Sequence, residues 1–172
     1  MGNTYVKIAT VTVGGGGAAT IDFSSIPSTY TDLELKISGR DTFASTGLSV
    51  FFTFNNNTGS VYSYKRLVGS GAAASSSSDS ARANDFVGDQ PGSTATASTF
   101  GNFQVYIPNY AGSTQKSYSA DAVMENNVSS PVYAFLTAGL STDTTAINRI
   151  TLTCQTNFAE YSTATLYGIS NS

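Results

Sequence analysis

The side chains best suited to acid–base chemistry in this sequence are acidic residues at short spacings. Four groups stand out: Asp32 with Glu34, Asp41 beside Arg40, Asp85 with Asp89, and Asp121 with Glu125. A retaining glycosidase needs two carboxylates about 5 Å apart, whereas Asp121 and Glu125 on one strand would be separated by roughly 13 Å. Catalysis would need carboxylates from different strands. We therefore interpret all four groups as solvent-facing charges that keep the protein soluble.

Nucleophilic catalysis has little support in the composition. The chain has no histidine and a single cysteine, so a Ser-His-Asp triad is excluded. Ser63 and Lys65 share one side of a predicted strand, which we interpret as a polar face. Cys154 lacks a general base and lies in the alternating run that begins at Ile150, so we predict a buried small hydrophobe. The sequence predicts that this protein is not an enzyme.

Metal and cofactor sites are also not predicted. Asn84, Asp85 and Asp89 come closest to a calcium-binding group, but their spacing matches no defined calcium loop. The glycine run from Gly14 to Gly17 lacks the following lysine and helix start of a phosphate-binding loop. We interpret that run as a hairpin tip and expect neither a metal nor a cofactor.

Charge and hydropathy exclude two classes of partner. The net charge is −3, and the eight basic residues are scattered along the chain, so no patch is predicted that could neutralise several phosphates. No stretch approaches the roughly 18 apolar residues of a membrane span. The N-terminus has no basic segment followed by an apolar one. We expect neither a nucleic-acid partner nor a membrane, and no classical export signal.

Alternation of apolar and polar residues recurs from end to end, as in Leu33, Leu35 and Ile37 between polar neighbours. This period of two indicates β-strands, and sustained helical spacing is absent. Ten strands are predicted, at 4–13, 18–23, 32–39, 47–55, 61–69, 99–108, 117–126, 132–139, 147–154 and 162–169. The sequence therefore predicts one all-β domain over 1–172, a two-sheet jelly-roll-like antiparallel sandwich of about eight to ten strands.

One stretch departs from this pattern, the serine- and alanine-rich segment at 70–92. Its small polar residues offer no core of their own, so we predict a long loop excursion from the sandwich. Loops longer than about 15 residues in compact domains tend to be functional or mobile. We expect this loop to reach a neighbouring subunit, and we expect deletion of 72–84 to leave the fold intact while weakening attachment.

Several segments together resemble a known family. The run Ile26-Pro-Ser-Thr-Tyr-Thr-Asp-Leu33 follows an N-terminal strand pair, Val105-Tyr-Ile-Pro-Asn-Tyr110 lies mid-chain, and Leu166-Tyr-Gly-Ile169 closes the chain. With these segments the chain is similar to small virion structural proteins of tailed bacteriophages, including phages of cyanobacteria and marine bacteria. The resemblance covers nearly the whole chain apart from 70–92, and it carries no catalytic residue.

The resemblance implies a capsid decoration (cement) protein or a tail-fibre module. A single compact sandwich with extended segments and many tyrosines favours the first, which would bind the major capsid protein across capsomer junctions. Family analogy adds a homotrimer on the capsid surface, assembled in the host cytoplasm. The residues predicted to contact partners are Asn3, Thr4, Tyr5, Ser76, Arg82, Phe86 and Tyr110. The alternative is a receptor-binding module that recognises host polysaccharide through a tyrosine-rich surface.

Overall fold

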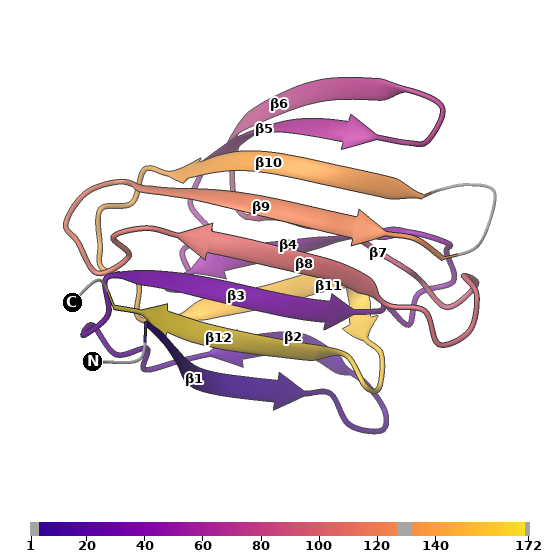
Figure 1. The fold of residues 1–172 in the computed structure, drawn as a ribbon, viewed down its shortest axis with the longest axis horizontal. Helices are drawn as coiled ribbons and strands as arrows, with labels where there is room; N and C mark the ends of the chain where they lie inside the picture. The colour runs from indigo at the N-terminus through magenta and orange to yellow at the C-terminus, as the bar shows by residue number, and fades with distance from the viewer. Residues whose placement is uncertain (1–3, 127–131, 171–172) are drawn as a thin grey trace.

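A computed structural model describes residues 4–126 and 132–170. Twelve antiparallel strands form two sheets that pack face to face (Figure 1). In spatial order the larger sheet contains β1 (Tyr5–Thr12), β12 (Thr163–Ile169), β3 (Asp32–Gly39), β8 (Gly101–Ile107), β9 (Lys116–Met124), β10 (Tyr133–Ser141), β5 (Tyr62–Gly69) and β6 (Ala74–Arg82). The smaller contains β2 (Ala18–Phe23), β11 (Ile150–Phe158), β4 (Leu48–Phe54) and β7 (Asp85–Gln90). The predicted all-β antiparallel sandwich is confirmed.

The alternating residues decide which face of each strand enters the core. On β9 every second residue is buried, from Lys116 through Tyr118 and Ala120, while those between are exposed. The interior is rich in aromatic rings: Phe52 of β4 and Tyr118 of β9 meet across the two sheets, with ring centroids 4.9 Å apart and nearly perpendicular planes. Such edge-to-face contacts add to the burial of the rings and hold the sheets together.

Eight of the strands follow a regular order in which the chain passes repeatedly from one sheet to the other. When β5, β6, β9 and β10 are set aside, the larger sheet has the order β1-β12-β3-β8 and the smaller has β2-β11-β4-β7. The set-aside strands form two hairpins, and these lie side by side because β10 pairs with both β9 and β5. The hairpins therefore extend one sheet well beyond the other.

The prediction of a long loop at 70–92 is wrong. The segment forms β6, the edge of the larger sheet, and β7, the edge of the smaller one. All ten predicted strands correspond to strands in the structure, and these two are the additional ones. The alternation rule missed β6 because nearly all of its side chains are exposed. Backbone hydrogen bonds to β5 hold it in place, and no side-chain pattern reports such bonds.

The register of β6 also bears on the expected deletion of 72–84. Ala74 pairs with Gly69 and Arg82 pairs with Tyr62, so β7 begins at the opposite end of β5 from Gly69. That separation is roughly 23 Å for seven residues of strand. Three peptide units between Gly69 and Asp85 would span at most about 11 Å. The deletion is therefore incompatible with keeping both β5 and β7 in place.

Candidate interaction surface

The outward side of the larger sheet divides into two regions of different character. We call the first the hairpin face; it consists of the outward side chains of β9, β10, β5 and β6. Cross-strand pairing sets Leu67 directly opposite Leu136, and Leu136 opposite Asp121. In the next row along, Lys65 lies opposite Ala138, which lies opposite Ser119. The hairpin face therefore has an apolar centre with charged residues on both sides.

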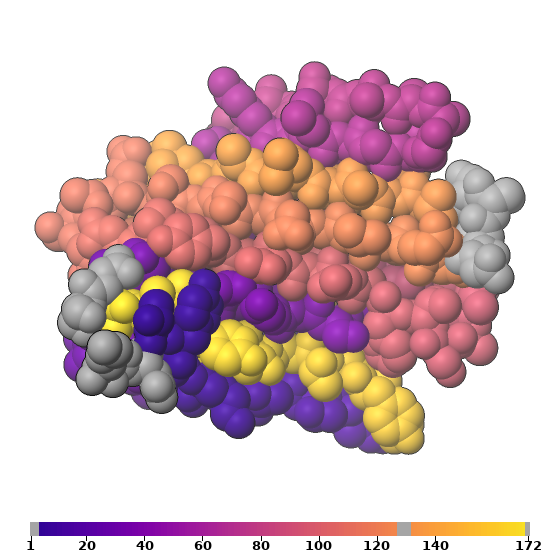
Figure 2. Space-filling view, in the orientation of Figure 1, coloured from indigo at the N-terminus to yellow at the C-terminus, as the bar shows by residue number. Residues whose placement is uncertain are grey.

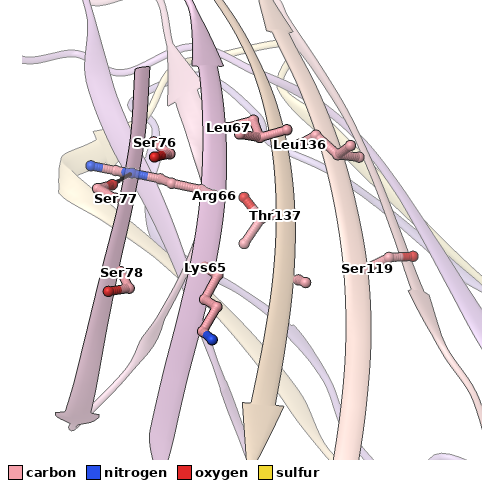
Figure 3. A pocket seen from close by; sticks show the side chains of 10 residues that line it. Lys65, Arg66, Leu67, Ser76, Ser77, Ser78, Ser119, Leu136 and Thr137 are labelled. Atoms are coloured by element: carbon pink, nitrogen blue, oxygen red, sulfur yellow. Dashed lines mark hydrogen bonds between the residues drawn. The ribbon is translucent and has the colours of Figure 1, made fainter. Parts of the chain in front are cut away.

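The apolar side chains of the hairpin face are open to solvent. Leu67 is 59% exposed and Leu136 is 57% exposed, and Val123 on β9 is also exposed. Figure 3 shows Leu67 and Leu136 side by side on adjacent strands. A groove of about 680 Å³ runs over them, lined by Lys65, Arg66, Leu67, Ser76, Ser77, Ser78, Ser119, Leu136, Thr137 and Ala138. Contiguous apolar surface of this kind marks interaction sites in soluble proteins.

The β5–β6 hairpin forms one border of this face, seen as the magenta ridge at the top of Figure 2. Its inner side is fastened through Arg66, whose guanidinium lies 4.4 Å from the centre of the Phe86 ring. The Arg66 Nε also donates a hydrogen bond to Ser77 Oγ at 2.8 Å, which joins β5 to β6. The far edge of β6 pairs with no other described strand. An unpaired edge leaves backbone donors and acceptors available to another chain.

The second region, which we call the tyrosine face, lies on the outward side of β1, β12, β3 and β8. The rings of Tyr5 and Tyr167 meet edge to face with centroids 6.4 Å apart. Tyr106 donates a hydrogen bond from its hydroxyl to Asp32 Oδ2 at 2.7 Å, which raises the pKa of Tyr106 to about 12. Hydrogen bonding to the Glu34 carboxylate likewise raises the pKa of Tyr5. The hydroxyl groups of Tyr106 and Tyr5 therefore donate hydrogen bonds to the carboxylates of Asp32 and Glu34.

Glu34 is only 2% exposed although it projects from the outward side of β3. It lies between Tyr106 and Tyr167 in the cross-strand register, and its Oε1 forms an ion pair with Lys36 Nζ at 3.2 Å. Neighbouring tyrosine rings thus cover a carboxylate that would otherwise face water.

Four of the seven predicted contact residues are accessible and two are not. Thr4, Tyr5 and Ser76 are exposed, and Arg82 is partly exposed while it forms a 2.6 Å ion pair with Asp79. The prediction fails for Phe86, which is buried beneath Arg66, and for Tyr110, which is fully buried and donates a hydrogen bond to the Pro27 carbonyl. Both aromatic rings pack in the core, because burying a large ring within the monomer stabilises the fold, and neither ring is then available to a partner. Asn3 lies outside the described residues.

The interpretation of the acidic groups as solvent-facing is wrong for four residues, Asp32, Glu34, Asp41 and Asp85, which are buried. Asp41 accepts backbone hydrogen bonds from Phe43 and Gln155 at 2.8 and 3.0 Å, so it joins the β3–β4 loop to β11. Burial raises the pKa of Asp85 to about 6. These carboxylates are placed by tertiary hydrogen bonds that sequence spacing does not reveal.

Cys154 is half-buried, and burial, together with the nearby Asp41 carboxylate, raises the pKa of its thiol to about 12. Such a pKa opposes formation of the reactive thiolate. Within the described ranges, no three His, Cys, Asp or Glu side chains gather closely enough to hold a metal ion. Over the same ranges, no helix has the length and apolar character needed to cross a membrane.

The sequence analysis did not predict the hairpin face, although the sequence of β10 contains one indication of it. Along β10 the outward residues Ala134, Leu136 and Leu140 are as apolar as the inward ones. A strand that is apolar on both sides is typical of burial on both sides. No family model matches this chain, and neither a curated protein nor a solved structure does.

Proposed function

We propose that this chain is a virion structural protein of a tailed bacteriophage, most specifically a capsid decoration protein that binds across capsomer junctions. The resemblance over nearly the whole sequence supports the family. The interleaved strand order supports the further proposal that the fold is a jelly roll with two inserted hairpins. The orders β1-β12-β3-β8 and β2-β11-β4-β7 are those of two Greek keys wound into one sandwich.

One observation carries the bridging role: the accessible contact residues lie at opposite edges of the larger sheet. Thr4 and Tyr5 lie at the β1 edge, and Ser76 and Arg82 lie on β6 at the other. Eight strands at about 4.8 Å spacing place these edges roughly 34 Å apart. Two sets of contacts so far apart suit a protein that touches two neighbouring shell subunits. Modest contacts repeated over a symmetric shell then give stable attachment.

Co-sedimentation with purified shells that lack the protein tests this function. We expect the wild-type protein to sediment with the shells, and we expect Tyr5→Lys at one edge and Ser75→Lys at the other each to lower occupancy several-fold. Ser75 is exposed on β6 next to Ser76, on the side of the strand away from the hairpin face. Gln104→Lys is the matched control, because Gln104 is exposed on β8 in the middle of the same sheet. Failure of the wild-type protein to bind, or equal occupancy for all variants, contradicts the proposal. The homotrimer implied by the resemblance is the alternative to the two-fold dimer proposed below, and the measured mass of the protein distinguishes the two.

A second candidate function is recognition of host polysaccharide by the tyrosine face. Because the hydroxyls of Tyr5 and Tyr106 donate inward to Glu34 and Asp32, their outward lone pairs are left to accept hydrogen bonds. Sugar hydroxyl groups are suitable donors, and the tyrosine rings offer apolar contact area. Binding to host surface polysaccharide that is lost in Tyr167→Ala but retained in Tyr161→Ala would support this function. Tyr161 is an exposed tyrosine in the turn before β12, outside the tyrosine face.

A further inference from the structure

The hairpin face is covered on its inner side only. Beneath it, Phe86 of β7 packs against Phe135 of β10 with ring centroids 5.2 Å apart. Its outer side has Leu67 and Leu136 open to water at the centre. Covering these two leucine side chains with a second layer of protein removes apolar surface from water, which favours association. β10 is therefore apolar on both sides, as is typical of a strand that is covered by protein on both sides.

The charges around this centre are self-complementary. Lys65 lies on β5, on one side of β10, and Asp121 lies on β9, on the other side. Both are exposed, and neither forms an ion pair with another residue in the described part of the chain. Opposite charges on either side of an apolar centre are what an isologous contact requires, because each charge then meets its opposite on the other copy.

We propose that the hairpin face binds the same face of a second copy of this chain about a two-fold axis, with Lys65 of each copy opposite Asp121 of the other. This inference rests on the hairpin face alone and does not depend on the proposed attachment to a capsid. The unpaired edge of β6 and the Tyr5 end of the sheet stay outside the contact.

The register of the strands tests whether this pairing is geometrically coherent. Lys65 and Asp121 are two strands apart and offset by two residues, so their midpoint falls between Leu136 and Ala138 on β10. A two-fold axis can pass through this midpoint, in the plane of the face and perpendicular to the line from Lys65 to Asp121. Rotation about this axis places Lys65 of one copy over Asp121 of the other. From the strand spacings, the same axis brings Leu136 of one copy within about 3 Å, measured in that plane, of the position above Leu67 of the other. The charge pairs and the leucine contact are thus satisfied together.

The size of the face is also adequate. β6, β9 and β10 are nine residues long and β5 is eight. At about 3.3 Å per residue and about 4.8 Å between strands, the four strands cover roughly 30 by 19 Å, or about 570 Å² in projection. Side-chain relief makes the accessible area larger than this projection, and a standard interface buries about 800 Å² per partner. The area of the face is therefore close to that of a standard dimer interface.

Sedimentation equilibrium over a range of protein concentrations tests the proposal. We expect wild-type protein to approach twice the monomer mass of 17.9 kDa, and Leu136→Glu to be monomeric with an unchanged circular dichroism spectrum. Tyr161→Glu, at an exposed residue in the turn before β12 and outside the hairpin face, is the control and should dimerise like the wild type. A wild-type monomer at about 100 μM, a trimer, or a dimer that Leu136→Glu leaves intact would overturn the proposal.

Charge exchange gives a sharper test that does not depend on the leucine. Lys65→Glu and Asp121→Lys should each raise the dimer dissociation constant about tenfold or more, because each places like charges opposite one another. The double variant restores opposite charges on both sides and should return the constant to within about threefold of wild type. A double variant that dimerises as weakly as the singles, or singles that dimerise like the wild type, would overturn the Lys65–Asp121 pairing.

Discussion

The two regions of the larger sheet share one hydrogen-bonded ladder but differ in what their outward side chains are suited to. On the tyrosine face, Glu34 pairs with Lys36 and accepts a hydrogen bond from Tyr5, and Tyr106 donates to Asp32, so these polar groups are satisfied within the chain. On the hairpin face, Leu67 and Leu136 face water and no described partner covers them. A sheet surface that satisfies its own polar groups is complete as a monomer surface. An exposed apolar one marks a place where a partner can bind.

The same contrast holds for backbone. β3 lies between β12 and β8 and is buried over most of its length, while β6 pairs on one edge only and is exposed over nearly all of its length. Stability in a folded protein is not uniform, and elements with few buried contacts open at lower free-energy cost. The β5–β6 hairpin is therefore the part of the molecule with most to gain from a partner.

The largest expected effect comes from removing β6 altogether. Deletion of 72–84 should abolish cooperative unfolding, a loss above about 5 kcal/mol, because the remaining link cannot reach from β5 to β7. Chemical denaturation followed by circular dichroism measures this. Ser75→Thr keeps the backbone length and should unfold like the wild type. A cooperative transition in the deletion variant would show that β6 is dispensable.

A matched pair of leucines tests the difference between covered and open surface. Leu33→Ala removes a fully buried side chain on β3 and should lower the free energy of unfolding by about 2–5 kcal/mol. Leu136→Ala removes a mostly exposed one on β10 and should cost less than about 1 kcal/mol in the monomer. Urea titrations at low protein concentration compare the two. Equal losses would mean that Leu136 is covered within the monomer.

Asp85 begins β7, where the chain leaves β6 and enters the smaller sheet, and its pKa predicts that stability depends on pH. Its folded pKa of about 6 exceeds the ordinary value of 3.8 because burial disfavours the charged form. The folded chain therefore holds a proton that the unfolded chain releases. This contribution to stability is fully present below pH 3.8 and is lost as the pH rises through about 6.

Asp85→Asn should remove this loss of stability at higher pH, because the asparagine side chain stays neutral. Its side-chain oxygen can still accept the hydrogen bond from the backbone N–H of Phe86. We expect the variant to exceed the wild type in unfolding free energy by about 1–3 kcal/mol at pH 7.5, and the difference to shrink below pH 5. Urea titrations across pH 4.5–7.5 measure both. A difference that does not change with pH would contradict the assignment of the effect to ionisation.

The smallest expected effect concerns the backbone of the hairpin. Ala81 has a φ of 55°, a left-handed conformation that disfavours a Cβ atom. Ala81→Gly should stabilise β6 by up to about 1 kcal/mol, measured as slower amide hydrogen exchange in β5 and β6. Ala83→Gly is the control at a neighbouring alanine outside the positive-φ set, and it should give no gain. Faster exchange in Ala81→Gly would show that the positive φ costs nothing.

Much of the fold could be predicted from sequence, because apolar and polar residues alternate along ten of the strands. β9 is a clear example, with alternate burial from Lys116 to Met124. β6 could not be predicted in this way, since its serines face solvent on both sides. The candidate site was recognised only in part: Ser76 lies on the hairpin face, while Leu67 and Leu136 were overlooked. Apolar residues in a strand pattern are ordinarily assigned to the core.

The sequence by itself determined the class of fold and the regions of ten of the twelve strands, since side-chain alternation is a local property of the chain. Only the tertiary structure decided which acidic residues are buried and which aromatic residues are exposed to solvent. Asp32 and Asp41 became hydrogen-bond acceptors inside the protein, and Phe86 and Tyr110 became part of the interior. Pairing between strands distant in sequence also placed Leu67 beside Leu136. Such register depends on the whole sheet, and no single segment encodes it.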